Sequence, residues 1–400
     1  LVLLDQNGVL LDHIDQIKGL RNNTILSLME DIDSNIWLGL DNGISYLNVK
    51  SPVKVYHDNK GVVGSTYAAA IKDNILYLGT NQGLFYKNME GDSDFKLVKG
   101  TQGQVWSLQE IGGTLFCCHH SGTFVVEGDS AKQITSLEGA WKINPLSGNP
   151  DLLLQGNYDG LYVLEKERGN WKLRNKIEGF EHSSRYFEIL GNKVFVNHEY
   201  KGIFKLDVDS SFHHVQSIAM DTLIKGSESG IVKYRDQLFY AYKEGVFKYQ
   251  PDSDSLVQDT LLSSIYNQDD YVSGKMVLDQ NEDNLWIFTN SNISLLSDGS
   301  LADTLLVKSI PLAENVRNGI VGYENIVNLG EERKYLLGTT SGYITLDVNA
   351  FQEPDLVVKI GRVQRSSKDS QSWTLIEKDS EVNLKSSENH LRFSFFTAEY

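Results

Sequence analysis

The stretch ILYLGTNQGLFY, from Ile75 to Tyr86, consists of two apolar runs separated by a short polar turn that ends in glycine. Apolar runs rich in β-branched and aromatic residues on either side of such a turn are typical of a β-hairpin. The last turn residue, Gly83, stands where we expect a positive φ, a conformation that glycine adopts without a steric clash at Cβ. The stretch therefore predicts two antiparallel strands joined by a glycine turn.

Seven further copies of this pattern occur along the chain, and another apolar run precedes each copy. The equivalent turn positions are spaced 38 to 50 residues apart, at Gly43, Gly83, Gly122, Gly160, Gly202, Gly245, Asn292 and Gly342. We interpret Asn292 as a replacement for glycine, because asparagine is the residue that next best tolerates a positive φ. Three or four strands in a period of about forty residues, with no amphipathic helix, are typical of a propeller blade. The sequence therefore predicts an all-β fold, a β-propeller of four-stranded blades.

Composition excludes several classes of partner for this segment. The chain has 400 residues, a formal net charge of -16 and a pI near 5.0. A negative field of this size repels a phosphate backbone, and no Lys/Arg-rich run opposes it, so we expect no direct nucleic-acid contact. No run of apolar residues has the length of a membrane span. The two cysteines, Cys117 and Cys118, are adjacent in an apolar run, and we expect them to be strand residues and not a disulfide.

One face of the propeller is expected to carry the ligand-binding residues. In a propeller the innermost strand of each blade starts on the face where the turn between the second and third strands also lies. Aromatic rings among hydrogen-bonding groups suit a carbohydrate or another polar ligand. The candidates at these positions are Tyr67, Trp106, Trp141, Tyr158, Arg185, Tyr186, His198, Tyr200, Tyr242 and Lys275. The alternative for each ring is that it only fills the wedge between two blades.

No pattern in the sequence predicts a reaction. The GxSxG, HExxH, P-loop and EF-hand motifs are missing from the sequence. The adjacent pairs His119-His120 and His213-His214 point to opposite faces if they lie in strands, so neither pair alone is arranged to chelate a metal. We expect no catalytic residue, no metal and no cofactor in this segment.

The stretch NNTILSLMEDIDSNIWLGLDNGISYL, from Asn22 to Leu47, resembles the two-component regulator propeller repeat found in extracytoplasmic sensors of Bacteroidetes transcriptional regulators. The residues that carry the resemblance are Asn23, Ile25, Ser27, Leu28, Glu30, Asp31, Trp37, Gly39, Asn42 and Gly43. Asn35 and Leu40 depart from the usual glycine and threonine. Near the end of the chain, EVNLKSSENHLRFSFFTAEY, from Glu381 to Tyr400, resembles part of the three-tyrosine (Y_Y_Y) β-sandwich of the same sensors.

The resemblance implies a domain order. Residues 1–55 are expected to be the last blade of a preceding propeller, residues 56–350 a seven-bladed propeller, and residues 351–400 the N-terminal part of the three-tyrosine sandwich. Pro52 and Pro354 stand in the extended stretches where the chain is expected to leave one domain for the next. A single eight-bladed ring is the alternative.

The resemblance also implies a function. It indicates the periplasmic ligand-sensing region of a membrane-anchored transcriptional regulator, of the hybrid two-component or the helix-turn-helix type, with the transmembrane helix outside this segment. The expected signal is an oligosaccharide or another polar nutrient, and the expected partner is a second copy in a homodimer. Two alternatives stay open: a propeller glycosidase or lyase, and a non-catalytic scaffold that binds other proteins.

Overall fold

The structure is a computed structural model, and it divides the chain into two compact units, Leu1–Ala350 and Phe351–Tyr400. The structure describes residues 1–16, 20–32, 34–58, 61–90, 94–266, 268–279, 284–298, 305–331, 333–351, 359–367, 372–376, 384 and 390–396. Within this part of the chain no helix is long and apolar enough to cross a membrane.

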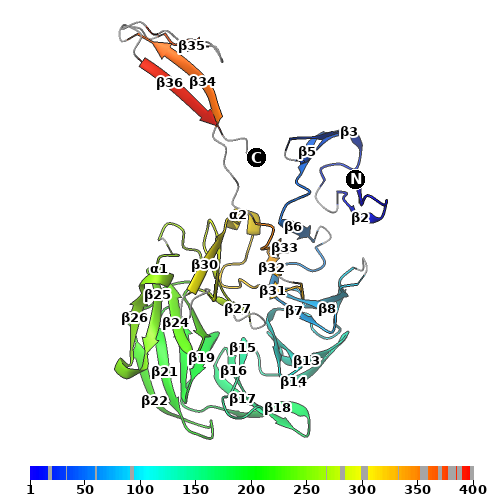
Figure 1. Ribbon diagram of the computed structural model, residues 1–400. Coiled ribbons are helices and arrows are strands. Elements are labelled where there is room, and N and C mark those ends of the chain that lie inside the picture. Colours follow the sequence, from blue (N-terminus) through cyan, green and yellow to red (C-terminus); the bar gives the residue numbers. More distant parts are fainter. Residues whose placement is uncertain are drawn as a thin grey trace. The chain divides into compact units, whose positions relative to one another are not determined.

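Seven four-stranded antiparallel sheets are present among the described residues, and they form the blades of a propeller (Figure 1). Blade 1 comprises β7 Thr66–Lys72, β8 Ile75–Thr80, β9 Leu84–Asn88 and β10 Lys96–Leu97. Blade 2 comprises β11 Val105–Ile111, β12 Thr114–His119, β13 Gly122–Glu127 and β14 Ser130–Thr135. Blade 3 comprises β15 Lys142–Pro145, β16 Leu152–Asn157, β17 Gly160–Glu167 and β18 Asn170–Lys176. Blade 4 comprises β19 Tyr186–Leu190, β20 Lys193–His198, β21 Gly202–Val208 and β22 Val215–Asp221.

The remaining blades carry the short helices of the ring. Blade 5 comprises β23 Gly230–Tyr234, β24 Gln237–Tyr242, β25 Gly245–Gln250 and β26 Ser255–Asp259, with the 3-10 turn η1 Pro251–Ser253 before β26 and helix α1 Thr260–Ser263 after it. Blade 6 comprises β27 Val277–Asp279, β28 Asn284–Phe288, β29 Ile293–Asp298 and β30 Leu305–Ile310, and helix α2 Glu314–Arg317 follows. Blade 7 comprises β31 Val327–Asn328, β32 Lys334–Thr339, β33 Gly342–Asp347 and the early strand β6 Val53–His57. The predicted all-β propeller class is confirmed.

The ring is closed by two strands that lie far apart in the sequence. β6 pairs antiparallel with β33, in a register that sets Val55 opposite Ile344 and Tyr56 opposite Tyr343. The rings of Tyr56 and Tyr343 are stacked, with centroids 4.7 Å apart and an interplanar angle of 12°. Residues 55 and 56 both lie within β6, so the chain enters the ring at Val53.

The core of the ring lies between neighbouring blades. Cys117 and Cys118 show the arrangement, because successive strand residues point to opposite faces of a sheet. Cys117 packs in a cluster with Tyr77 of blade 1, whereas Cys118 packs in a cluster with Leu153 of blade 3. Both cysteines are fully buried strand residues, as predicted, and burial raises the pKa of the Cys118 thiol to about 12. A thiol in such a site stays protonated and unreactive.

The hairpin glycines have the predicted positive φ, but Asn292 does not. Gly122 has φ +136° and Gly202 has φ +110°. Asn292 is not among the described residues with positive φ. Its turn is held by Thr289, whose backbone N–H donates to the Asn292 carbonyl at 2.9 Å and whose Oγ1 accepts from the Asn292 N–H at 3.2 Å. The interpretation of Asn292 as a residue with positive φ was therefore wrong. The same hydrogen bonds join Thr80 to Gly83 in blade 1, where the glycine has φ +158°, so these bonds do not account for the difference.

The residues before β6 form a separate small sheet in order β3-β4-β5, with β3 Ile25–Glu30, β4 Ile36–Leu40 and β5 Gly43–Leu47. A hairpin of β1 Val2–Leu4 and β2 Leu10–His13 precedes it. In β4, the Trp37 indole donates to the Asp31 carboxylate at 2.9 Å, and Leu38 and Leu40 pack on Leu20.

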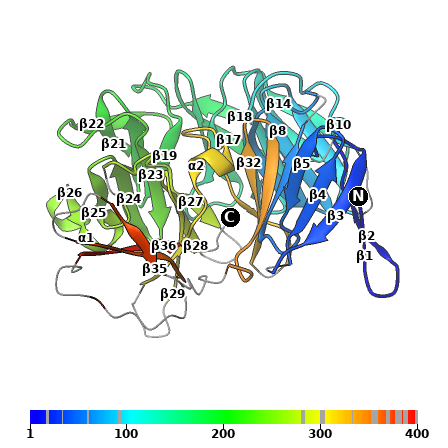
Figure 2. The same ribbon diagram turned by 90° about the horizontal axis from the view of Figure 1, so that it is seen from above.

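The second unit contains a three-stranded antiparallel sheet in order β35-β34-β36, with β34 Lys359–Ser366, β35 Thr374–Ile376 and β36 His390–Phe396. Of the stretch that resembles the three-tyrosine sandwich, the structure describes only residues 384 and 390–396. The sandwich assignment otherwise lies outside the described residues and stays a prediction. Figure 2 gives a second view of the strands.

Candidate functional site

Aromatic side chains gather where the innermost strands of several blades begin. Tyr67 lies in β7 and Trp106 in β11, while Trp141 directly precedes β15 and Tyr323 precedes β31. The Trp106 ring centroid is 5.7 Å from that of Tyr67, 4.9 Å from that of Trp141 and 5.8 Å from that of Tyr323. These four residues, with Tyr158 and Tyr186, are called the aromatic cluster below.

Arg185, directly before β19, joins the aromatic cluster by its guanidinium. The guanidinium carbon lies 4.1 Å from the ring centroid of Tyr323 and 5.4 Å from that of Trp141, within the range of cation–π attraction. Its Nη2 donates to the Gly322 carbonyl at 2.7 Å, and the Tyr186 hydroxyl donates to the same oxygen at 2.5 Å. Burial raises the pKa of Tyr186, so its hydroxyl remains a donor. Arg185 and Tyr186 therefore both donate to the Gly322 carbonyl oxygen, beside the rings of the aromatic cluster.

The segment Asn318–Glu324, between α2 and β31, is called the crossing loop here. Through Gly322 it contacts blade 4, and the Tyr323 ring centroid lies 4.6 Å from that of Tyr67 in blade 1. Through Glu324 it contacts Ser273, just before blade 6. In a seven-bladed ring, blades 4 and 7 lie on opposite sides. A loop of blade 7 reaches all these partners only near the axis, so the crossing loop lies close to the axis of the propeller.

Five charged side chains lie in or beside the crossing loop: Arg185, Lys275, Glu199, Glu228 and Glu324, the last of which belongs to the loop itself. Glu324 is buried and accepts hydrogen bonds from Ser273 Oγ at 3.3 Å and from the Gly322 N–H at 3.1 Å. Burial lowers the pKa of Lys275 to about 8, against the opposing effect of the Glu324 charge, and burial likewise raises the pKa of Glu324. The pKa of Glu199 is raised by burial first and by the neighbouring Glu228 second. The site thus holds Lys275 and Arg185 among three carboxylates.

The structure brings some candidates to the aromatic cluster and leaves others apart from it. Tyr158 lies in the turn between β16 and β17, 5.0 Å from Trp141 by ring centroids, and its hydroxyl hydrogen-bonds with His120 Nδ1 at 3.2 Å. His198 and Tyr200 pack with each other, and Tyr200 is 76% exposed. Tyr242 is not part of the cluster: its ring packs in the core between blades and its hydroxyl donates to Glu244 at 3.0 Å.

Tyr323 is a site residue that the sequence analysis missed. The repeat pattern placed the innermost strand of the last blade from Ile326, three residues further on, and β31 itself begins at Val327. The signal that points to Tyr323 is the spacing of 50 residues between Asn292 and Gly342, the longest in the series, which leaves room for a loop before the innermost strand.

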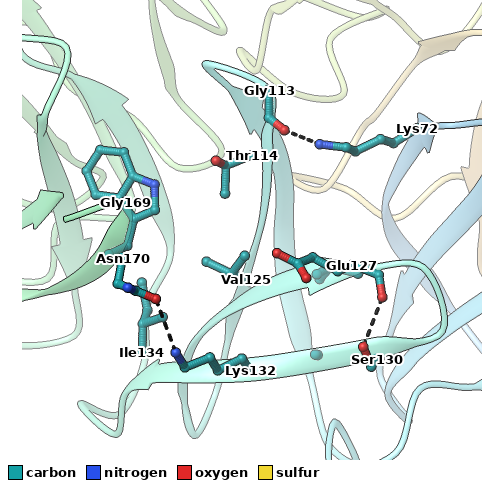
Figure 3. A pocket seen from close by; sticks show the side chains of 13 residues that line it. Lys72, Gly113, Thr114, Val125, Glu127, Ser130, Lys132, Ile134, Gly169 and Asn170 are labelled. Carbon is teal, nitrogen blue, oxygen red and sulfur yellow. Dashed lines mark hydrogen bonds between the residues drawn. The ribbon is translucent and has the colours of Figure 1, made fainter. Parts of the chain in front are cut away.

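A cavity of about 400 Å³ lies between blades 2 and 3, and Figure 3 shows its lining side chains. The cavity is lined by the first residues of β12, β14 and β18. These strands begin at the end of the blades where the innermost strands finish. The aromatic cluster lies where the innermost strands begin, so the cavity is at the opposite end of the blades. Its two lysines are already bonded: Lys72 donates to the Gly113 carbonyl and Lys132 to Asn170 Oδ1. We therefore favour the aromatic cluster as the binding site, since its aromatic faces and convergent donors suit a ligand better.

The described part of the chain contains no group of three or more His, Cys, Asp or Glu side chains placed to hold a metal ion.

Comparison with known proteins confirms the family resemblance. Residues 19–42 match the family described as the two component regulator propeller. No curated protein matches the chain.

Solved structures match over nearly the whole chain. The extracellular domain of BT3049 from B. thetaiotaomicron, described as a hybrid two component system, is 14% identical, with a TM-score of 0.69 over 98% of this chain and 55% of that chain. The extracellular domain of BT4673 from B. thetaiotaomicron, described as a one component system, is 16% identical, with a TM-score of 0.56 over 94% of this chain and 56% of that chain. The chain thus spans little more than half the length of these structures. At such low identity the match shows the fold.

Proposed function

We propose that this chain is the ligand-recognising, extracytoplasmic region of a membrane-anchored transcriptional regulator, and that it binds an oligosaccharide or another polar nutrient at the aromatic cluster. The observation that carries the proposal is the convergence of Trp106, Trp141 and Arg185, which come from three different blades. The similarity of the fold to extracellular domains of two component systems supports the sensing role.

The side chains of the aromatic cluster are suited to binding and not to a covalent step. Stacked rings offer apolar faces, and Arg185 and Tyr186 offer hydrogen-bond donors, which together match the faces and the hydroxyls of a sugar. A reaction would need an activated nucleophile or a pair of positioned acids. We propose that the region recognises its ligand without turnover and transmits the signal through a homodimer in the periplasm.

Thermal unfolding of the purified chain in the presence of oligosaccharide fragments tests the proposal. We expect one class of fragment to raise the melting temperature, and we expect Trp106→Ala to weaken its binding about tenfold or more, because the mutation removes the ring at the centre of the cluster. Tyr200→Ala, an exposed tyrosine at the same end of blade 4 but outside the cluster, is the matched control and should bind normally.

Three results would contradict this proposal. Equal binding by Trp106→Ala would move the site away from the aromatic cluster. Chromatographic detection of cleaved fragments would favour the glycosidase or lyase alternative. A chain that binds no fragment but captures a protein partner would favour the scaffold. Sedimentation velocity with and without the bound fragment tests the dimer separately.

A further inference from the structure

The crossing loop occupies the surface on which a ligand of the aromatic cluster would rest. The Tyr323 ring lies against Tyr67 and under the Arg185 guanidinium, at centroid distances of 4.6 and 4.1 Å. The Gly322 carbonyl takes the hydrogen bonds of both Arg185 and Tyr186. The Tyr323 ring and the Gly322 carbonyl thus occupy the stacking face of Tyr67 and the hydrogen-bond donors of Arg185 and Tyr186, which a ligand would otherwise use.

Hydrogen bonds anchor the crossing loop at its two ends, and its middle contacts the site through Gly322 and Tyr323. At one end, the buried Arg317 donates to the backbone carbonyls of Leu312 and Thr289, both at 2.6 Å. At the other, Asn325 accepts from the Gly338 N–H at 3.1 Å. Between these anchors the loop contains no regular secondary structure.

Glycine at position 322 permits the close approach of the loop to its partners. Gly322 has φ +76°, and a Cβ there would lie 3.1 Å from Arg185 Nη2, 3.2 Å from Glu228 Oε2 and 3.3 Å from the Tyr186 hydroxyl. A side chain at this position would strain the backbone and crowd all three groups. The covered arrangement therefore depends on Gly322.

We propose that the crossing loop is an internal occupant of the binding site, held there by Gly322 and Tyr323, and that an uncharged sugar ring displaces it, Tyr323 included, from the other members of the aromatic cluster. The inference rests on the proposed function of the aromatic cluster. Displacement frees the faces of Tyr67 and Trp106 and the donors of Arg185 and Tyr186. Glu199 and Glu228 remain close to Arg185. Their carboxylates accept hydrogen bonds from hydroxyl groups and offset the positive charge of Arg185, so the site favours a neutral sugar over an acidic one.

Two loop variants test the displacement with neutral and acidic disaccharides as probes. Titration calorimetry with cellobiose, lactose and mannobiose is compared with digalacturonic acid for the unsubstituted chain, Tyr323→Ala and Gly322→Ala. Removing the competing ring or straining the covered loop should tighten neutral-sugar binding about tenfold, as expected when a site that is open about a tenth of the time becomes open most of the time. Gly330→Ala is the matched control, since Gly330 has φ +80° but no atom within 4 Å of a Cβ, and it should leave binding unchanged.

Hydrogen exchange gives a second measurement that does not depend on affinity. Bound sugar should speed amide exchange across residues 318–324 in the unsubstituted chain, because the loop leaves its partners, while the strands of blade 4 exchange more slowly. This experiment uses the most tightly bound neutral disaccharide.

The outcomes separate this inference from the proposed function. The displacement would be overturned, and the binding site left in place, by the following result. Neutral sugars bind in a way that depends on Trp106, neither Tyr323→Ala nor Gly322→Ala tightens this binding, and amide exchange at 318–324 is unchanged by the sugar. Tighter binding of digalacturonic acid than of every neutral probe would overturn the uncharged ligand class. Failure of all four probes to bind any variant would overturn both the displacement by a sugar and the proposed sugar site.

Discussion

At the residue scale, some hairpin glycines do more than permit a turn, because the backbone of the outermost strand passes directly beside them. A Cβ on Gly122 would lie 2.0 Å from the carbonyl oxygen of Thr135, in the fourth strand of the same blade. The structure must shift a β-ladder carbonyl to accept any side chain at this position. A glycine at this turn therefore sets both the conformation of the hairpin and the spacing of the outer strand.

We expect Gly122→Ala to destabilise the ring by about 2–4 kcal/mol, from the strained backbone together with a disturbed ladder hydrogen bond. Gly43→Ala separates the two causes: Gly43 has nearly the same φ, +137°, but a Cβ there meets no atom nearer than Arg21 Nη1 at 3.7 Å. Thermal unfolding should therefore show a clearly larger fall in melting temperature for Gly122→Ala. Equal falls would mean that the nearby carbonyl is unimportant.

His119 makes stability depend on pH. It is buried at the end of β12, and its Nδ1 accepts a hydrogen bond from the Ser121 N–H at 2.9 Å, so the neutral ring is the form that fits. Burial lowers the pKa of His119 below its ordinary 6.5. The His119 side chain therefore binds a proton more readily in the unfolded chain than in the folded one. The contribution of the neutral, buried ring to stability is complete above pH 6.5 and is lost as the pH falls from 6.5 towards the lower folded-state pKa.

Melting temperatures at pH 7.5, 6.5 and 5.5 measure this effect. We expect the melting temperature of the unsubstituted chain to decrease below pH 6.5, and His119→Asn to reduce the decrease. The decrease should not vanish, since burial also lowers the pKa of His182 and of His198. An identical pH dependence in His119→Asn would exclude His119 as a source.

At the element scale, helix α2 depends on one side chain. The helix has only four residues, too few to be stable by its own hydrogen bonds. Arg317 holds it in place: the residue is 3% exposed, and its guanidinium pairs with Glu314 at 2.6 Å and donates to three backbone carbonyls. The same side chain anchors the start of the crossing loop.

We expect Arg317→Met to destabilise the chain by about 3–5 kcal/mol, because it leaves several buried acceptors without a donor. Arg317→Lys should recover only part of the loss, since an ammonium group does not reproduce the planar fork of donors. Denaturant unfolding measures both, with the exposed Arg168→Met as control. A stability for Arg317→Met within about 0.5 kcal/mol of the control, the usual range for surface substitutions, would mean that α2 does not need the guanidinium.

Local elements could be predicted from the sequence, whereas contacts across the ring could not. Hairpins depend on neighbours in sequence, so turn spacing was enough to predict the blades. Tyr323 was missed because its partners come from blades 1, 2 and 4, and no local pattern records such a meeting. Tyr242 was predicted at the ligand face from its turn position, but its ring packs inward against Tyr240. Repeat position selected Tyr242 and passed over Tyr323, because it does not record contacts between blades.

At the scale of the whole molecule, the ring is held closed by the pairing of β6 with β33, which joins residues nearly 290 positions apart. Bringing such distant segments together costs loop-closure entropy, which the pairing must offset. Part of the compensation comes from the stacked rings of Tyr56 and Tyr343, the latter of which also accepts a hydrogen bond from Lys87 of blade 1 at 3.0 Å. Closure therefore joins blade 7 to blade 1 through side chains as well as through the sheet.

A double-mutant cycle tests this closure. We expect Tyr56→Ala and Tyr343→Ala each to lower the free energy of unfolding. The loss of free energy in the double variant should be smaller than the sum of the two single losses, by about 0.5–1.5 kcal/mol, because each mutation removes the same stacking contact. The parallel cycle of Tyr46→Ala with Tyr343→Ala is the control, since Tyr46 is as exposed as Tyr56, at 39%, but lies in β5 outside the ring. In this control cycle the losses of free energy of unfolding should be additive. Additive losses for Tyr56 and Tyr343 as well would mean that backbone pairing alone closes the propeller.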